Sequence, residues 1–192
     1  MKINAAPRIL IVAGVCVLAL IGLVVSEGFA RQGGQDVLLP MEAVDPRSLL
    51  SGHYVQLNLT QRLEPNETCP SVAGEEWIAL REAGEAHVAI GTAASREQAQ
   101  LLGLPIRGQL TCSAPAPGSD LIEGTPGWVQ LDLGFDRFHI NQTEALRIER
   151  VLREQTVNEA TRAYAIVSVG RDGRGRLRGL VVDGERFELD WL

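Results

Sequence analysis

The chain opens with its longest apolar run. Residues 9–25 contain no charged side chain, and the short segment before them carries Lys2 and Arg8. As a helix this run extends about 25 Å, at about 1.5 Å per residue, which approaches the thickness of a bilayer core, about 30 Å. The run therefore predicts one membrane-spanning helix that begins at Ile9 and ends at Val25, with the lipid bilayer as its partner.

The charges around this run predict its orientation. A positive flank is typical of a cytoplasmic N-terminus, which puts residues 31–192 on the periplasmic or extracytoplasmic side of the inner (plasma) membrane. We therefore expect a single-pass anchor, residues 1–30, and an exported domain, residues 31–192, joined by a flexible linker at 31–36. A cleaved signal peptide is the alternative, because residues 28–30, Gly-Phe-Ala, resemble a cleavage site.

Beyond the anchor, polar and apolar residues alternate with the period of two that marks half-buried strands. Between residues 54 and 59, Val55, Leu57 and Leu59 share one face and Tyr54 lies on the other. The alternation recurs at residues 128–133. Further strands, several joined by glycine-containing turns that predict hairpins, are expected at residues 37–39, 76–80, 87–90, 105–112, 162–169, 176–182 and 186–189.

Two segments carry helical signals instead. Residues 141–154 begin at a capping Asn141 and carry one apolar stripe, which predicts the main helix. A shorter helix is expected at residues 95–102, with Ser95 as its N-cap and Gly103 as its end. The expected fold class is α+β: a transmembrane helix followed by a mainly antiparallel domain of about eight strands, barrel- or sandwich-like, with one main helix.

The charge of the exported part excludes one class of partner. Beyond residue 30 the chain carries 16 arginines and no lysine against 23 carboxylates, a net charge of −7. Binding to nucleic acid is driven by basic surface that neutralises phosphates. We therefore expect no nucleic-acid partner.

The three cysteines divide between the two parts of the chain. Cys16 lies in the apolar run, where it acts as a small hydrophobic residue. Cys69 and Cys112 lie in the exported part, where an even pair predicts a disulfide in an oxidising compartment. A pair of free or redox-active thiols is the alternative.

A family resemblance is carried by the segment from Val44 to Leu59. It resembles the signature of the GDYXXLXY family, bacterial proteins with an N-terminal membrane segment, and the likeness extends over most of residues 37–188. The matching motif positions are Asp45, Pro46, Gly52, His53, Tyr54, Leu57 and Leu59.

Two of these positions depart from the family pattern. His53 stands where the family has Asp, and Leu59 where it has a second Tyr. The resemblance implies no established activity. It does imply a multi-pass membrane protein as a partner, because members are often encoded beside one.

Catalytic patterns are weak in this sequence. The segment before residue 54 faintly resembles signal peptidases, whose chemistry needs a serine and a neutral lysine, yet Lys2 is the only lysine. The histidines His53, His87 and His139 are far apart and lack metal-ligand or triad spacing. We expect no catalytic residue, no metal ligand and no cofactor.

The glycine- and arginine-rich segment 170–178 lies between two expected strands. Its four arginines suggest either a solvated hairpin tip, which we favour, or a site for an anion or a lipid headgroup. The function that these patterns favour is a non-enzymatic accessory or interaction module of the envelope. A hydrolase- or peptidase-like enzyme and a small-ligand or cell-wall binding module are the alternatives.

Overall fold

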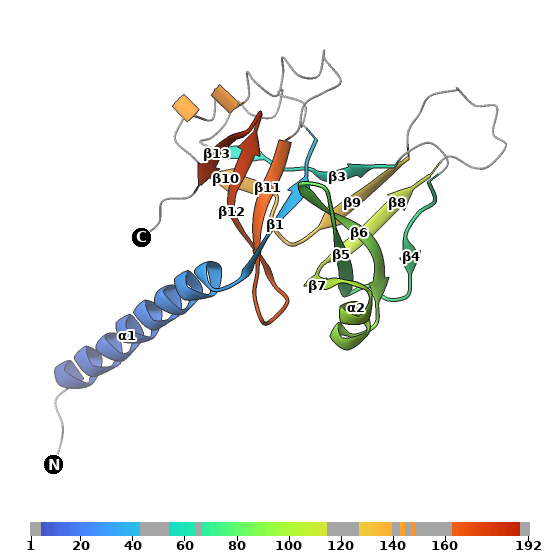
Figure 1. The fold of residues 1–192 in the computed structure, drawn as a ribbon. Helices are drawn as coiled ribbons and strands as arrows, with labels where there is room; N and C mark the ends of the chain where they lie inside the picture. Colours follow the sequence, from blue (N-terminus) through green and yellow to red (C-terminus); the bar gives the residue numbers. More distant parts are fainter. Residues whose placement is uncertain are drawn as a thin grey trace.

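The computed structural model describes residues 5–42, 54–63, 67–114, 127–139, 143–144, 147–148 and 163–188, with the backbone alone at residues 5–6, 54–56 and 139. Figure 1 shows its elements, which follow one another as α1 (Ala5–Gln32), β1 (Gln35–Pro40), β2 (Tyr54–Gln56), β3 (Leu59–Arg62), β4 (Ser71–Val72), β5 (Trp77–Ala83), β6 (Ala86–Ala93), α2 (Arg96–Leu102), β7 (Leu104–Arg107), β8 (Gln109–Ser113), β9 (Trp128–Asp132), β10 (Arg137–His139), β11 (Ala163–Val169), β12 (Gly175–Val182) and β13 (Glu185–Glu188).

The strands form four sheets, in the orders β1-β11-β12-β13, β4-β6-β5-β7, β3-β9-β8 and β10-β2. Neighbouring strands are antiparallel except β4 and β6. The predicted α+β class is therefore confirmed. Within the described residues no sheet closes into a barrel.

Two expected strands are each divided between two sheets, which is one reason why there are more strands than the predicted eight or so. The segment 54–59 bends after Gln56, where the Leu57 amide donates to the Asp136 carbonyl over 2.8 Å. The segment 105–112 bends at Gly108, whose amide donates to the Glu76 carbonyl over 3.1 Å. In both cases this hydrogen bond is the last that the segment makes beside its first partner strand, and the residues that follow pair with β9 instead.

One apolar core joins strands from all four sheets. Its fully buried members include Leu39, Ile78, Ile106, Val129, Phe138 and Leu180. Strand β5 is covered on both faces: Ile78 and Leu80 point into this core, whereas Trp77 and Ala79 pack with Ala99 of α2. A strand buried on both faces loses the polar alternation of a half-buried one, which explains the continuous apolar run at 77–80.

Local signals placed the turns and the short helix correctly. Helix α2 begins after Ser95, whose hydroxyl accepts from the Gln98 amide, and ends where the Gly103 amide donates to the Ala99 carbonyl. The hairpin turns at Gly84 and at Asp183-Gly184 have the positive φ values that tight turns require. The predicted main helix, 141–154, lies mostly outside the described residues; residues 143–144 and 147–148 of it are helical.

Helix α1 extends beyond the predicted apolar run at both ends and projects away from the β domain (Figure 1). It is long and apolar enough to cross a membrane, and none of its most apolar stretch is buried in the protein. The expected linker at 31–36 is wrong. Only Gly33 and Gly34 separate α1 from β1, because Gln35 already pairs with Val169 of β11.

Candidate functional site

The family-motif positions fall into two groups. Asp45, Pro46, Gly52 and His53 lie outside the described residues, as does the side chain of Tyr54. The backbone of Tyr54 pairs with His139 across β2 and β10. Leu57 and Leu59 are both buried in the main core. At position 59, where the family pattern has Tyr, this chain therefore buries an aliphatic side chain in the core.

Cys69 and Cys112 form a disulfide, as predicted, with their Cα atoms 5.9 Å apart. The bond ties the segment that precedes β4 to strand β8, and both cysteines pack against the main core. A bridge across 43 residues of sequence stabilises the fold mainly by restricting the unfolded chain. Cys16 is free and exposed on α1.

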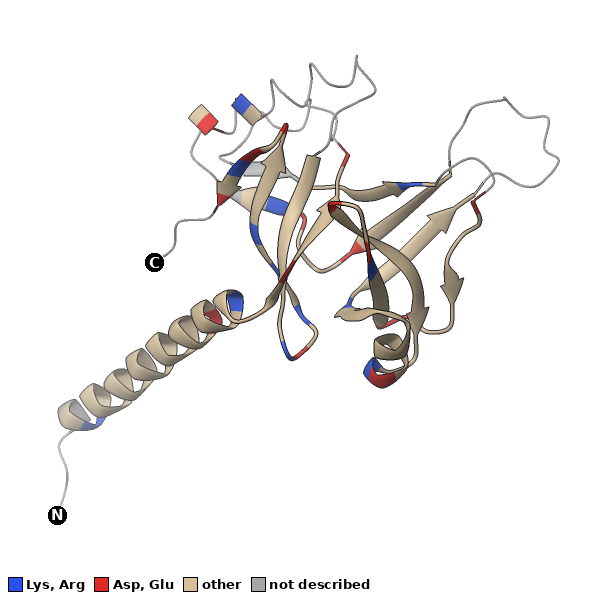
Figure 2. Cartoon of the chain, viewed as in Figure 1, with Lys and Arg blue, Asp and Glu red and all other residues tan. Residues whose placement is uncertain are grey.

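Charged residues gather where α1 meets the β11–β12 hairpin. We call Glu27, Arg31, Asp172 and Arg176 the junction. The Arg176 Nε donates to Glu27 Oε1 over 2.8 Å, and its two Nη atoms donate to the Asp172 carboxylate over 3.2 and 3.0 Å. Arg31 lies 3.7 Å from Glu27. Figure 2 shows that charge on α1 is confined to its two ends, with the interior of the helix uncharged.

The strand register explains why the junction forms. Because Gln35 pairs with Val169, β1 begins beside the last residue before the hairpin tip, residues 170–174. The preceding Gly34 packs so closely on Ser168 and Val169 that a Cβ there would collide with both. The end of α1 and the hairpin tip therefore lie together, and Arg176 reaches back to the helix.

The junction changes the proton affinities of its own members. The double hydrogen bond from Arg176 lowers the pKa of Asp172 from 3.8 to about 2. The hydrogen bond to Asp172, together with that to Glu27, raises the pKa of Arg176. Both effects favour the charged forms of Asp172 and Arg176, so this pair stays ionised at neutral pH. Its Arg176 side chain is only 11% exposed.

Arg178 makes a second ionic contact on the same hairpin. Its Nη1 donates to Asp36 Oδ2 of β1 over 2.6 Å. Arg178 is also the extra residue of a β-bulge, because Ile166 pairs with Gly179 while Val167 pairs with Leu177. Two of the four arginines in segment 170–178 are thus held in ion pairs, which corrects the expectation of a solvated tip for Arg176 and Arg178.

The other two arginines of this segment, Arg171 and Arg174, are exposed. Arg174 lines a cavity of about 640 Å³ between the hairpin tip, β7 and the start of α2, which we call the arginine cavity. Its lining residues are Trp77, Ala94, Ser95, Arg96, Glu97, Arg107, Asp172 and Arg174. A second cavity of about 380 Å³, whose lining includes Asp132, is also lined by Arg107 and Arg174.

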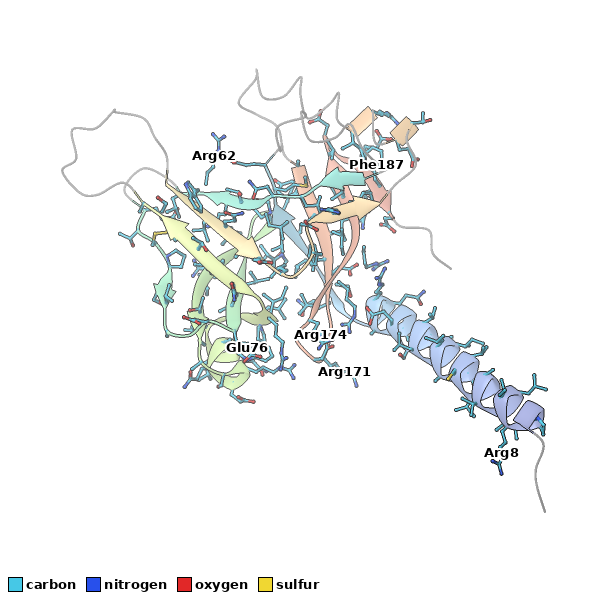
Figure 3. All side chains as sticks on the ribbon, turned by 180° about the vertical axis from the view of Figure 1, so that it is seen from behind. Arg8, Arg62, Glu76, Arg171, Arg174 and Phe187 are labelled. Atoms are coloured by element: carbon cyan, nitrogen blue, oxygen red, sulfur yellow. A yellow bond between two sulfur atoms is a disulfide. The ribbon has the colours of Figure 1, made fainter. Side chains whose placement is uncertain are left out.

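Arg107 lines both cavities. Its guanidinium lies 4.9 Å from the centre of the Trp77 ring and 3.5 Å from Glu76. Its backbone amide donates to the Gly173 carbonyl over 2.8 Å, which fixes the tip against β7. Gly173 has φ +77° and its Cα lies against the Trp77 ring. Figure 3 shows Arg171 and Arg174 at this end of the domain, near α1.

The junction was missed because its partners are distant in sequence. Glu27 and Arg176 are 149 residues apart, and no local pattern connects them. The only sequence signal was the arginine-rich turn itself.

Among the described residues, no group of three or more His, Cys, Asp or Glu side chains is placed to hold a metal ion. The backbone at His139 lies beside Tyr54, whereas His87 is in β6.

These observations define a class: a single exposed apolar helix joined directly to a disulfide-containing, mainly antiparallel β domain. The family model of GDYXXLXY proteins matches residues 16–180, and the chain belongs to that family. The match includes most of α1 as well as the β domain. No curated protein and no solved structure matches the chain.

Proposed function

We propose that this protein is a single-pass membrane protein whose β domain, on the outer side of the membrane, serves as a non-enzymatic interaction module for a multi-pass membrane partner. One observation carries the proposal: α1 is apolar and unburied along its length, yet its last turns are fixed to the domain. An apolar helix that the domain does not cover needs another apolar environment, and a bilayer supplies it.

The junction supports an anchor that is kept in the mature protein. A signal peptide is removed and has no reason to form ion pairs with the domain that it exports. Here Glu27 is a partner of Arg176, and cleavage after Ala30 would remove that partner. The charge before the run and the disulfide support the outward orientation of the domain.

The proposal of a protein partner rests on exposed apolar side chains near the same end of the domain. Leu101 of α2 is 87% exposed and Leu102 is 51% exposed. These two adjacent leucines form an exposed apolar surface on α2 that a protein partner could cover. A domain held at a membrane by a two-residue connection would meet membrane proteins at a high effective concentration.

Photocrosslinking of the full-length chain in its native membrane tests the proposal. A photoreactive phenylalanine analogue at Leu101 should capture one multi-pass membrane protein. The same analogue at Val72, which is exposed on β4, serves as the control and should not capture it. Capture at Leu101 should be lost with Leu102→Ser. No membrane-protein adduct at Leu101, or equal adducts at both positions, would contradict the partner role.

A further inference from the structure

We infer that the β11–β12 tip, through Arg171 and Arg174 together with Arg107, is a docking surface for anionic phospholipid headgroups. The inference rests on the proposed anchor and adds what the domain does at the membrane surface. It assigns a ligand to the two arginines of the tip that the junction does not use, and to the arginine cavity beside them.

The position of the tip relative to α1 is the first step. Glu27 is two residues beyond Val25, where the uncharged run ends, and two residues of helix advance about 3 Å. Arg176 is bound to Glu27, and Gly34 packs on Ser168 and Val169 just before the tip. If α1 crosses the bilayer, the hairpin tip therefore lies at the depth of the headgroups.

The charge of the tip is the second step. Among the described residues, no carboxylate forms an ion pair with the guanidinium of Arg171 or Arg174, and both side chains are exposed. The nearest acid, Asp172, is engaged by both Nη atoms of Arg176. Glu76 lies beside Arg107, and Glu97 lies on the α2 side of the cavity. Arg96 lines the same cavity.

The contrast with the rest of the molecule is the third step. The exported part has a net charge of −7 and is repelled by an anionic leaflet. Arg171 and Arg174, which form no ion pair within the described part of the chain, give the edge close to the anchor a positive charge that such a surface attracts. Guanidinium groups bind phosphate through paired N–H donors. The expected consequence is a fixed orientation of the domain, with the tip on the headgroups.

Hydrogen exchange of the full-length chain in lipid nanodiscs tests this inference. One set of discs contains phosphatidylcholine alone, and the other adds phosphatidylglycerol. We expect slower amide exchange in segment 170–175 in the phosphatidylglycerol discs, and loss of this difference at high salt. Each arginine near an anionic surface changes the docked fraction about fivefold, so Arg171→Gln with Arg174→Gln should abolish the protection.

A matched pair of variants controls for net charge. Arg62→Gln with Arg186→Gln removes the same charge from β3 and β13, where both arginines are exposed and form ion pairs, and should keep the protection. Figure 3 shows Arg62, and Phe187 next to Arg186 in the chain, at the end of the domain away from Arg171 and Arg174. Arg171→Lys with Arg174→Lys should keep most of it. Because Arg171 and Arg174 are exposed, circular dichroism should show all variants folded.

Three results would overturn the inference. The first is equal exchange in both kinds of disc for the unchanged chain. The second is protection that persists in the doubly glutamine-substituted chain. The third is equal protection in neutral discs by inorganic phosphate, which would make the site a pocket for a free anion. Failure of the chain to incorporate into any disc would instead contradict the proposed anchor.

Discussion

Arg176 and Arg174 stand two residues apart in one hairpin, and their surroundings differ sharply. Arg176 is 11% exposed and is bound by one carboxylate from α1 and one from its own turn. Arg174 is exposed and borders an open cavity. One short, basic turn therefore serves two purposes. Arg176, where the turn joins β12, forms the ion pairs that fix the helix. Arg174, at the tip, presents its charge outside the domain.

The largest expected effect comes from a bond that involves neither arginine. Replacing Cys69 and Cys112 by alanine should lower the free energy of unfolding by about 4 kcal/mol, because the unfolded chain regains the freedom of a long loop. Chemical denaturation of the full chain in detergent measures it. The Glu27–Arg176 contact should persist in the folded variant. Its loss there would show that the junction depends on the disulfide.

The direct test of the comparison substitutes each arginine in turn. Arg176→Gln leaves Glu27 and Asp172 close together without their shared cation, which should lower the free energy of unfolding by about 1–3 kcal/mol. Arg174→Gln should change it by less than about 0.5 kcal/mol, as at other exposed sites. Denaturant titration in detergent compares them. Equal losses would mean that Arg174 has a structural partner.

A matched pair of glycines tests how the tip is held on Trp77. Gly173 and Gly134 both have positive φ, but a Cβ at Gly173 would collide with the Trp77 ring, whereas a Cβ at Gly134 meets open space. Gly134→Ala should cost about 1–2 kcal/mol from backbone strain alone. Gly173→Ala should cost more and should change the fluorescence of Trp77. If the two variants are equally stable, the tip is not packed against Trp77.

The turns of this fold were predictable from sequence because their causes are local. Glycines at positions that need positive φ marked the hairpins, and Ser95 marked α2. The features that were missed have non-local causes. The segment around Leu57 changes its partner strand from β10 to β9, and the bulge at Arg178 reverses the alternation that a sequence pattern relies on.

The candidate site divides in the same way. The apolar run and the arginine-rich turn were each visible in the sequence, as was the cysteine pair. Their assembly was not, because the register of β1 on β11 brings residue 27 next to residue 176. The stacking of Arg107 on Trp77 likewise depends on β5 pairing with β7, with Trp77 directly opposite Arg107.

The smallest expected effect is a shift in the titration of the junction. The pKa of Asp172 is lowered to about 2, so the stability it contributes is fully present above its ordinary value of 3.8 and is lost as the pH falls toward 2. Because this carboxylate is half-exposed, the loss should be small. An NMR titration of its side-chain carboxyl carbon should give a midpoint near 2.

Arg176→Gln should move that midpoint back toward 3.8, because the Arg176 side chain makes the strongest contact with the carboxylate. Arg174→Gln should leave it unchanged, because Arg174 binds the carboxylate through its backbone amide, which the substitution keeps. A midpoint that is the same in all three proteins would show that the lowered pKa does not come from the junction.

The most direct test of the account is the intact mass of the protein extracted from its own membranes with detergent. If α1 is the anchor, it stays attached and Glu27 binds Arg176 in the mature protein. The predicted mass therefore corresponds to a chain that starts at Met1 or Lys2. A mass that corresponds to a start near Arg31 would show that the helix is removed as a signal peptide, and would contradict the anchor, the junction and the docking of the tip together.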